Sequence, residues 1–217
     1  MNVLVACEES QRVCLEFRKR GHNAFSADLQ KCSGGYPEWH IQGDVLPLIY
    51  PNKDIEFITS TGRKFYIDKW DLLIAHPPCT YLSVAGVCNL IPNGRMNYDR
   101  LQKGFEAADF FYKMLNAPID HICVENPRPI ARFGLPPRSQ VIEPWWFDEV
   151  GDEQFTKRTY LWLKNLPYLT PTTLWSSGEV RSWTFIHSSA KLRSKTFCGV
   201  AAAMANQWNE EILKGYA

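Results

Sequence analysis

Apolar segments of strand length alternate with amphipathic segments through more than half of this sequence, and no other feature constrains its fold more. The segments at residues 10–21 and 98–116 repeat apolar residues at helical spacing. Strands without a polar face, separated by helices, are typical of a parallel sheet covered on both sides. We therefore predict a Rossmann-like α/β fold, with helices on both faces of a mostly parallel sheet. The predicted strands lie at residues 3–7, 24–29, 41–46, 70–79 and 120–127.

The remaining segments are more mixed. Residues 55–67 place two β-rich arms around a Ser-Thr-Gly-Arg turn, which predicts a hairpin. Residues 141–147 and 155–163 are predicted strands, and residues 199–213 a terminal helix. No internal repeat or low-complexity linker divides the chain, so we expect a single domain over residues 1–217.

Composition excludes several classes of protein. With 24 basic and 23 acidic residues and 13% aromatic residues, the chain is too balanced and too aromatic for intrinsic disorder. No apolar run approaches the roughly 20 residues of a membrane helix, and we expect no membrane association. The first ten residues lack the basic region of a signal peptide, so we expect a cytoplasmic protein.

The seven cysteines and five histidines show no metal-ligand spacing. No C-x-x-C pair is present, so we predict neither a disulfide framework nor a zinc cluster. Most of the cysteines are expected to be small buried hydrophobes in a reducing compartment. We therefore predict no metal site.

Two predicted strands end in reactive side chains held by prolines. One strand runs into His76, Pro77, Pro78 and Cys79, and another ends at Glu125, followed by Asn126 and Pro127. If these strands are neighbours, both loops emerge at the carboxyl edge of the sheet, where ligands of open α/β folds bind. A thiol and a carboxyl on rigid loops are candidates for a nucleophile and an acid. The alternatives are a core cysteine beside a turn and a surface or helix-terminal carboxylate.

The Pro-Pro-Cys sequence followed by Thr80, and the later Glu-Asn-Pro, resemble the nucleophile and Glu-Asn loops of DNA (cytosine-5) methyltransferases. The resemblance covers most of the chain in the right order. It implies the class I S-adenosylmethionine-dependent methyltransferase fold, with Cys79 as nucleophile and Glu125 as the acid that holds cytosine. It further implies that Pro78 and Asn126 lie beside the base.

The resemblance also implies a site for S-adenosylmethionine at the ends of the first three strands. The family binds the methionine part after its first strand, the ribose at an acid after the second, and the adenine near an acid after the third. The corresponding residues, with Pro77 beside them, are Cys7, Glu8, Asp28, Leu29, Asp44 and Val45.

Two later segments extend the resemblance. Lys157 and Arg158 precede a predicted strand, as in the family's basic strand near the catalytic loop. This implies a substrate contact for Lys157 and a catalytic role for Arg158. Residues 196–208 resemble the family's last motif, which returns to pack beside the cofactor.

The chemistry of C5 methylation suits these residue types. Cytosine C5 is a poor nucleophile until a thiolate, here Cys79, adds to C6 and creates an enamine. Glu125, protonated or sharing a proton, would bind N3 and the exocyclic amine, a task that favours a raised carboxyl pKa. In duplex DNA the base must also be flipped out of the stack.

The first loop departs from the family pattern. Where the family has Phe-x-Gly-x-Gly-Gly, this chain has residues 7–11, Cys-Glu-Glu-Ser-Gln, without a glycine. Glu8 or Glu9 would meet the ammonium group of the cofactor, or both acids would only favour a helix N-terminus. In the last motif, Gly199 is followed by Val200 rather than by asparagine.

The chain is also short for this family. Residues 164–194 stand where relatives carry a target-recognition domain, and they are too few for an independent one. Their basic and aromatic side chains are either DNA contacts or a solvated face. We expect relaxed specificity, a specificity partner protein or a single-stranded rather than duplex DNA substrate, in a compact, phage-like enzyme acting in a bacterial host cytoplasm. The proposed contacts are Arg181, Lys191 and Arg193.

Two other functions stay open from the sequence. The same cysteine chemistry would act on a free cytosine nucleotide, or with another one-carbon donor. A noncatalytic DNA-binding or decoy protein would keep the fold without the reaction. The intact Cys79 and Glu125 favour an enzyme, whereas the glycine-free loop favours the decoy.

Overall fold

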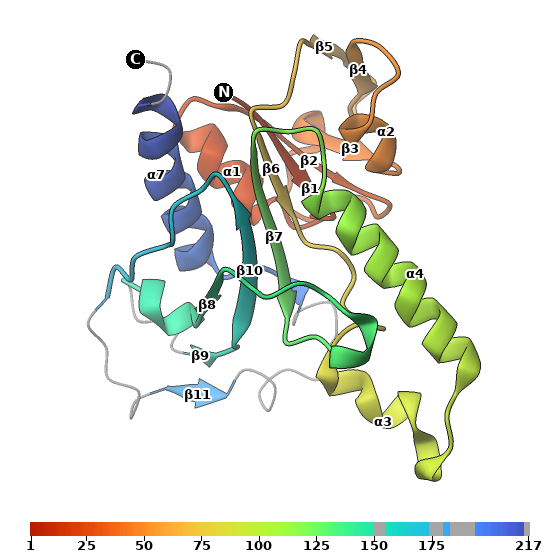
Figure 1. Ribbon diagram of the computed structural model, residues 1–217. Coiled ribbons are helices and arrows are strands. Elements are labelled where there is room, and N and C mark those ends of the chain that lie inside the picture. The colour runs from red at the N-terminus through yellow and green to blue at the C-terminus, as the bar shows by residue number, and fades with distance from the viewer. Residues whose placement is uncertain (150–154, 174–179, 183–193, 215–217) are drawn as a thin grey trace.

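Seven strands form the central sheet of the computed structural model, which describes residues 1–149, 155–173, 180–182 and 194–214. The strand order is β3-β2-β1-β6-β7-β10-β8, and all pairings are parallel except those of β10 with β7 and β8 (Figure 1). This is the mostly parallel α/β fold that the sequence predicts. The strands are β1 (Asn2–Ala6), β2 (Asn23–Asp28), β3 (His40–Gln42), β6 (Leu72–Ala75), β7 (His121–Pro127), β8 (Gln140–Ile142) and β10 (Thr159–Lys164).

Helices cover both faces of this sheet. Helices α1 (Arg12–Lys19) and α7 (Cys198–Lys214) pack together on one face, and α4 (Tyr98–Leu115) lies on the other (Figure 1). Strand β1 serves both sides, since Val3 and Val5 belong to the core under α1 and α7, whereas Leu4 and Ala6 belong to the core under α4. All four side chains are fully buried, as expected of a central parallel strand.

Smaller elements complete the chain. The predicted hairpin is present as β4 (Ile55–Ile58) and β5 (Lys64–Ile67), which pair in antiparallel register. Two short strands, β9 (Phe155–Thr156) and β11 (Arg181–Ser182), pair in parallel. The short helices are α2 (Leu46–Ile49), α3 (Val87–Leu90), η1 (Pro37–Trp39), η2 (Val84–Gly86), η3 (Pro92–Gly94), η4 (Ala131–Phe133) and η5 (Pro144–Phe147).

Three sequence predictions about local structure are wrong. Residues 41–46 are not one strand, because β3 ends at Gln42 and α2 begins at Leu46. Residues 141–147 leave the sheet after Ile142, because Pro144 has no N–H for a strand ladder and starts η5 instead. Residues 155–163 are not one strand, because β9 ends at Thr156 and β10 begins at Thr159.

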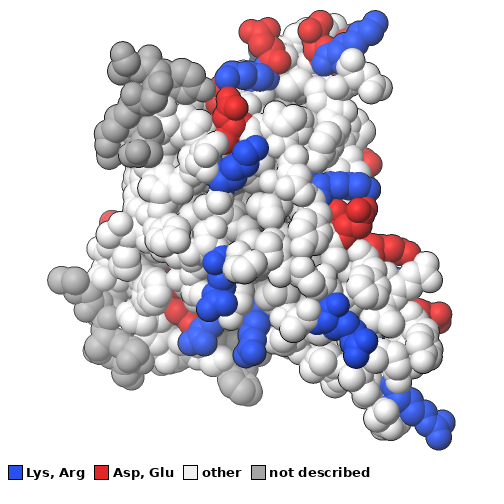
Figure 2. Space-filling view, in the orientation of Figure 1, with Lys and Arg blue, Asp and Glu red and all other residues white. Residues whose placement is uncertain are grey.

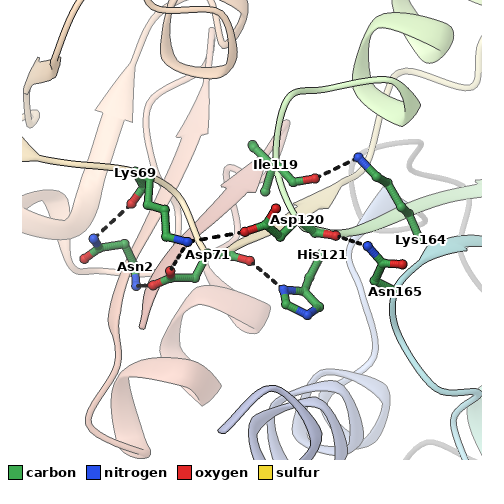
Figure 3. Close-up of polar contacts among 8 residues, drawn as sticks. All are labelled: Asn2, Lys69, Asp71, Ile119, Asp120, His121, Lys164 and Asn165. Atoms are coloured by element: carbon green, nitrogen blue, oxygen red, sulfur yellow. Dashed lines mark hydrogen bonds and ion pairs between the residues drawn. The ribbon is translucent and has the colours of Figure 1, made fainter. Parts of the chain in front are cut away.

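Polar contacts tie the strands together at the edge opposite the carboxyl ends of the parallel strands. The backbone N–H of Asn2 donates to Asp71 at 2.7 Å, and Lys69 pairs with Asp120 at 3.3 Å (Figure 3). Lys164 donates to the carbonyl of Ile119 at 2.9 Å. These contacts join the ends of β1, β6, β7 and β10 and leave the other edge for a ligand.

Within the described residues, no helix combines the length and the apolar character needed to cross a membrane.

A glycine sets how closely α7 approaches η5. A Cβ at Gly199 would overlap the carbonyl group of Phe147, a backbone atom that cannot rotate away. Gly199→Ala should therefore lower the free energy of unfolding by about 1–3 kcal/mol. Alanine is the better helix former by roughly 1 kcal/mol, so helix propensity alone predicts the opposite sign.

Urea unfolding of the two proteins measures this difference. Gly43→Ala is the matched control, because nothing lies within 4 Å of a Cβ at that position. A Gly199→Ala protein as stable as the parent would show that the close approach does not constrain α7.

Candidate active site

The strands that carry the two candidate reactive groups are neighbours, as the sequence analysis required. β6 and β7 pair in parallel, with Ile74 opposite Cys123 and Ala75 opposite Val124. The chain therefore leaves β6 toward Cys79 at the same edge at which β7 carries Glu125. This edge lies at the bottom of the view in Figure 1.

Direct hydrogen bonds join the two loops beyond the strands. The side-chain amide of Asn126 is buried and donates to the carbonyl of Pro77 at 3.0 Å. Further out, Val84 N–H donates to Arg128 at 3.0 Å, and Ile130 N–H donates to Leu82 at 2.7 Å. Cys79 and Glu125 are thus held in one rigid unit, although 46 residues separate them in the sequence.

His76 contacts Glu125 directly. Its Nδ1 lies 3.3 Å from Oε2 of Glu125, and the two side chains are only 9% and 17% exposed. With Glu125 ionised, the imidazole N–H donates this bond. The other ring nitrogen, Nε2, is buried and has no hydrogen-bond partner among the described residues.

The pKa of Glu125 is lowered, which corrects the raised pKa expected from the sequence. Burial alone raises this pKa, but the hydrogen bond and charge of His76 outweigh it, and the charge of Lys157 adds to their effect. Glu8 has a raised pKa because its burial outweighs the charge of His76 and two backbone N–H bonds. One histidine therefore lies near two buried acids of opposite tendency.

Lys157, rather than Arg158, is the cation of this cluster. Burial lowers the pKa of Lys157, and the nearby charges of Glu125 and Cys79 partly restore it. Arg158 is 69% exposed and pairs with Glu143 at 3.3 Å, so the structure does not bring it to the cluster.

The C-terminal segment closes one side of the site. Glu125, Lys157, Thr196 and Phe197 line the same small cavity. The guanidinium of Arg12, in the first turn of α1, donates to the carbonyl of Thr196 at 2.6 Å. The segment around Thr196 and Phe197 thus returns to the beginning of α1 and to the candidate acid.

In the first loop, which has no glycine, two other residues adopt the left-handed backbone conformation. Cys7 and Gln11 both have φ of 59°, a backbone conformation in which glycine is the usual residue. The close approach that glycine permits comes from the other side of the loop, at Gly34. A Cβ there would lie 2.6 Å from the Cβ of Gln11 and from the carbonyl oxygen of Ser10.

The two acids of this loop have different surroundings. The carboxylate of Glu8 accepts bonds from the N–H groups of Val13 at 2.7 Å and Cys14 at 3.2 Å, and so caps α1. Glu9 is 7% exposed, and neither carboxylate oxygen has a hydrogen bond within the described part of the chain. Its ion-pair partner is Lys195, at 4.0 Å.

The predicted cofactor residues converge at the ends of β1, β2 and β3. Burial and the charges of Asp28 and Asp44 raise the pKa of Cys7 to about 12, so both acids face the end of β1. Beside them, Leu29 is 74% exposed and Val45 is buried. The carboxylates of Asp28 and Asp44 accept N–H bonds from Gln30 and Leu46, at 2.8 and 3.0 Å.

Of the three predicted DNA contacts in residues 164–194, the structure describes one. Arg181 lies in β11, which pairs with β9, whereas Lys191 and Arg193 lie outside the described residues. Among the residues that the structure describes, no group of three or more His, Cys, Asp or Glu side chains could hold a metal ion.

The sequence analysis named His76 beside Pro77 without assigning it a contact, and the resemblance implied a catalytic role for Arg158 and a substrate contact for Lys157. The structure brings His76 and Lys157, but not Arg158, to the cluster around Glu125. The sequence signal for His76 was its position directly before Pro77 and Pro78, at the end of a predicted strand. Its contact with Glu125 is visible only in the structure. Which of two adjacent basic residues faces the site depends on the register of β10, which the sequence pattern does not define.

Comparisons with known proteins add little to this geometry. No protein-family model and no curated protein matches the sequence. Similar solved structures include an E. coli protein provisionally described as a DNA modification methyltransferase encoded within a prophage. The chains are 12% identical, with a TM-score of 0.41 over 75% of this chain and 46% of the other. This chain spans less than half of that protein, and so distant a likeness carries no argument about activity.

The contact between His76 and Glu125 makes a prediction about proton binding. His76→Asn, which keeps a neutral donor, and His76→Ala, which keeps none, should both raise the pKa of Glu125, the alanine variant more. Carbon-13 NMR of glutamate carboxyls, with the resonance identified by Glu125→Gln, measures the change. A carboxyl pKa that stays the same in both variants would contradict the proposed electrostatics.

The sign of the pH effect on stability follows. Because the pKa of Glu125 is lower folded than unfolded, its contribution to stability is present above the unfolded pKa. That contribution is lost as the pH falls through the folded pKa. The parent protein should therefore lose more stability on acidification than His76→Ala does.

Proposed function

We propose that this protein transfers a methyl group from S-adenosylmethionine to C5 of cytosine in DNA. The observation that carries the proposal is the joining of the Cys79 and Glu125 loops, through Asn126 and Pro77, beside the cation of Lys157. In this proposal, Cys79 is the nucleophile and Glu125 the acid, and a positive charge accompanies them at the carboxyl edge of the parallel strands. The comparisons do not contribute to the argument.

Lys157 prepares Cys79 for attack. A cation beside a cysteine favours the thiolate, which is the nucleophilic form. The sulfur adds to C6 of the cytosine ring, the C5–C6 π electrons form a C4–C5 double bond, and the former C4–N3 π pair goes to N3, which takes a proton from Glu125. The resulting enamine is nucleophilic at C5. After C5 has been methylated, a base, for which solvent water suffices, takes the C5 proton, the C5–C6 double bond re-forms, and the pair of the C6–S bond leaves with the Cys79 thiolate.

Glu125 binds the base and needs a proton for this task. Its carboxylate accepts from the exocyclic amine, and a protonated oxygen donates to N3. The nearest source is the Nδ1 proton of His76, 3.3 Å away. The step starts from the imidazolium form of His76: transfer of its Nδ1 proton to Glu125 leaves a neutral imidazole and a carboxylic acid, so no charge remains unpaired in the buried pair. His76 acts here as a positioning residue, not as one that touches the base.

The ends of β1, β2 and β3 fit S-adenosylmethionine. Asp28 and Asp44 would accept from the ribose hydroxyls and the adenine amine, beside Cys7, Leu29, Val45 and Pro77. Glu9, buried and without a hydrogen bond among the described residues, is better suited to the ammonium group than Glu8, whose oxygens cap α1. When bound, the cofactor supplies an electrophilic methyl group on its sulfonium.

Methyl transfer from labelled S-adenosylmethionine tests the proposal. Duplex DNA, single-stranded DNA and dCMP are offered separately, and the methylated base is identified after digestion. We expect 5-methylcytosine in DNA. Label in dCMP alone would instead identify a nucleotide enzyme, and methylation at an exocyclic amine would refute the Cys79 mechanism.

Variants of the reactive groups sharpen the test. Cys79→Ala should abolish the reaction, and Glu125→Gln should slow it about 10²–10⁴-fold, the usual contribution of a positioned acid. Cys88→Ala is the matched control, because this cysteine is exposed in the nearby α3. Unchanged activity in Cys79→Ala, or equal loss in both cysteine variants, would contradict the assigned nucleophile.

A further inference from the structure

The two loops of the active site continue into segments that are almost free of acids. Residues 77–98 and 127–142 contain no Asp or Glu, and Asp99 is the first acid after Cys79. The segments are joined by the isolated bridge between Ser83 and Pro129. They therefore form one continuous surface around the reactive groups.

Six cations lie on this surface, and we call them the basic rim. Four are on the acid-free segments and two follow in the first turns of α4. Within the described part of the chain, none of them makes an ion pair. The basic rim consists of Arg95, Arg100, Lys103, Arg128, Arg132 and Arg138.

The space-filling view shows where positive charge gathers. Lys and Arg side chains follow the lower edge of this face, below the carboxyl ends of the central strands in Figure 1 (Figure 2). They continue to the tip of the segment that carries α3. Elsewhere on the same face, basic and acidic side chains are interspersed.

One cation of the rim is fixed directly to the nucleophile loop. The guanidinium of Arg100 donates to the carbonyl of Thr80 at 2.6 Å, next in sequence to Cys79. It also lies over the ring of Tyr81, 5.0 Å from the centroid, and the ammonium of Lys103 lies 5.7 Å from the same ring. Arg100 and Lys103 thus hold positive charge against the two residues that follow Cys79 in the sequence.

Apolar side chains are exposed among these charges. Ile91 is 43% exposed, Phe105 51% and Tyr98 75%. Cations with interleaved aromatic and aliphatic groups suit a nucleic acid, which presents phosphates and the faces of bases. A membrane or an acidic protein would also be attracted by the positive charge, but neither carries a nucleic-acid base that Cys79 could attack.

We propose that the basic rim is the main DNA-binding surface of this protein and holds the strand whose cytosine enters the site. This inference rests on the proposed function for the identity of the base. The sequence prediction assigned the DNA contacts to Arg181, Lys191 and Arg193 in residues 164–194, with Arg128, Arg132 and Arg138 only as added positive charge after the Glu-Asn loop. Contacts between the cations of the basic rim and phosphates would give affinity for DNA without a choice of sequence.

Salt-dependent DNA binding tests the rim. Fluorescence anisotropy of labelled duplex and single-stranded DNA gives the slope of log K against log salt concentration, which is about −0.9 per phosphate contact for duplex. The variant Arg95→Gln/Lys103→Gln/Arg132→Gln removes three exposed cations outside the catalytic cluster. Its slope should be less steep by about 2–3, with about tenfold weaker binding per contact at 0.1 M salt.

Lys53→Gln/Arg63→Gln/Lys113→Gln is the matched control, with the same change in net charge. These cations lie in the loop before β4, in the β4–β5 turn and in the last turn of α4. Its slope should stay within about 0.5 of the parent value. Equal effects in both triple variants, or an unchanged slope in the rim variant, would overturn the proposal. Thermal unfolding verifies that both triple variants are folded.

Methyl transfer assayed in parallel separates this inference from the proposed function. A weaker slope in the rim variant without any methyl transfer by the parent protein supports the rim and refutes the enzyme. Methyl transfer to DNA that is equally sensitive to both triple variants supports the enzyme and refutes the rim.

Discussion

The parallel pairing of β6 with β7 is the constraint on which the candidate site depends. It brings two loops, 46 residues apart in sequence, to one edge, and the buried bond from Asn126 to Pro77 then fixes their separation. Residues 72–75 of β6 and 122–124 of β7 are apolar and fully buried, and both strands are held at their other ends by the contacts around Asp71 and Asp120. The reactive side chains are therefore positioned by the core rather than by their own loops.

Electrostatics divides the molecule in a way that its net charge of +1 conceals. Acids gather at the ends of β1, β2 and β3, where a cofactor carrying ammonium, hydroxyl and amine groups would bind. Cations frame the ends of β6 and β7, where a polyanionic substrate would bind. His76 lies between these two regions, and its charge acts on the pKa of both Glu8 and Glu125.

The sequence pattern predicted the elements that depend only on residues close together in the sequence. The apolar strands, the hairpin and α4 follow from period and turn chemistry, and the pairing of the two reactive loops follows from the topology of parallel sheets. The cap of α1 by Glu8, the contact of His76 with Glu125 and the choice of Lys157 over Arg158 depend on register and on contacts distant in sequence. No local pattern encodes these contacts, and they decide the electrostatics of the site.

The central claim is that the sulfur of Cys79 forms a covalent bond with C6 of cytosine in DNA. DNA containing 5-fluorocytosine tests it most directly, because fluorine at C5 cannot leave as a proton does and the adduct persists after methylation. Digestion and mass spectrometry of the complex should place the nucleotide on the peptide that contains Cys79. An adduct on another cysteine, or none under conditions in which the protein methylates unmodified DNA, would contradict the claim.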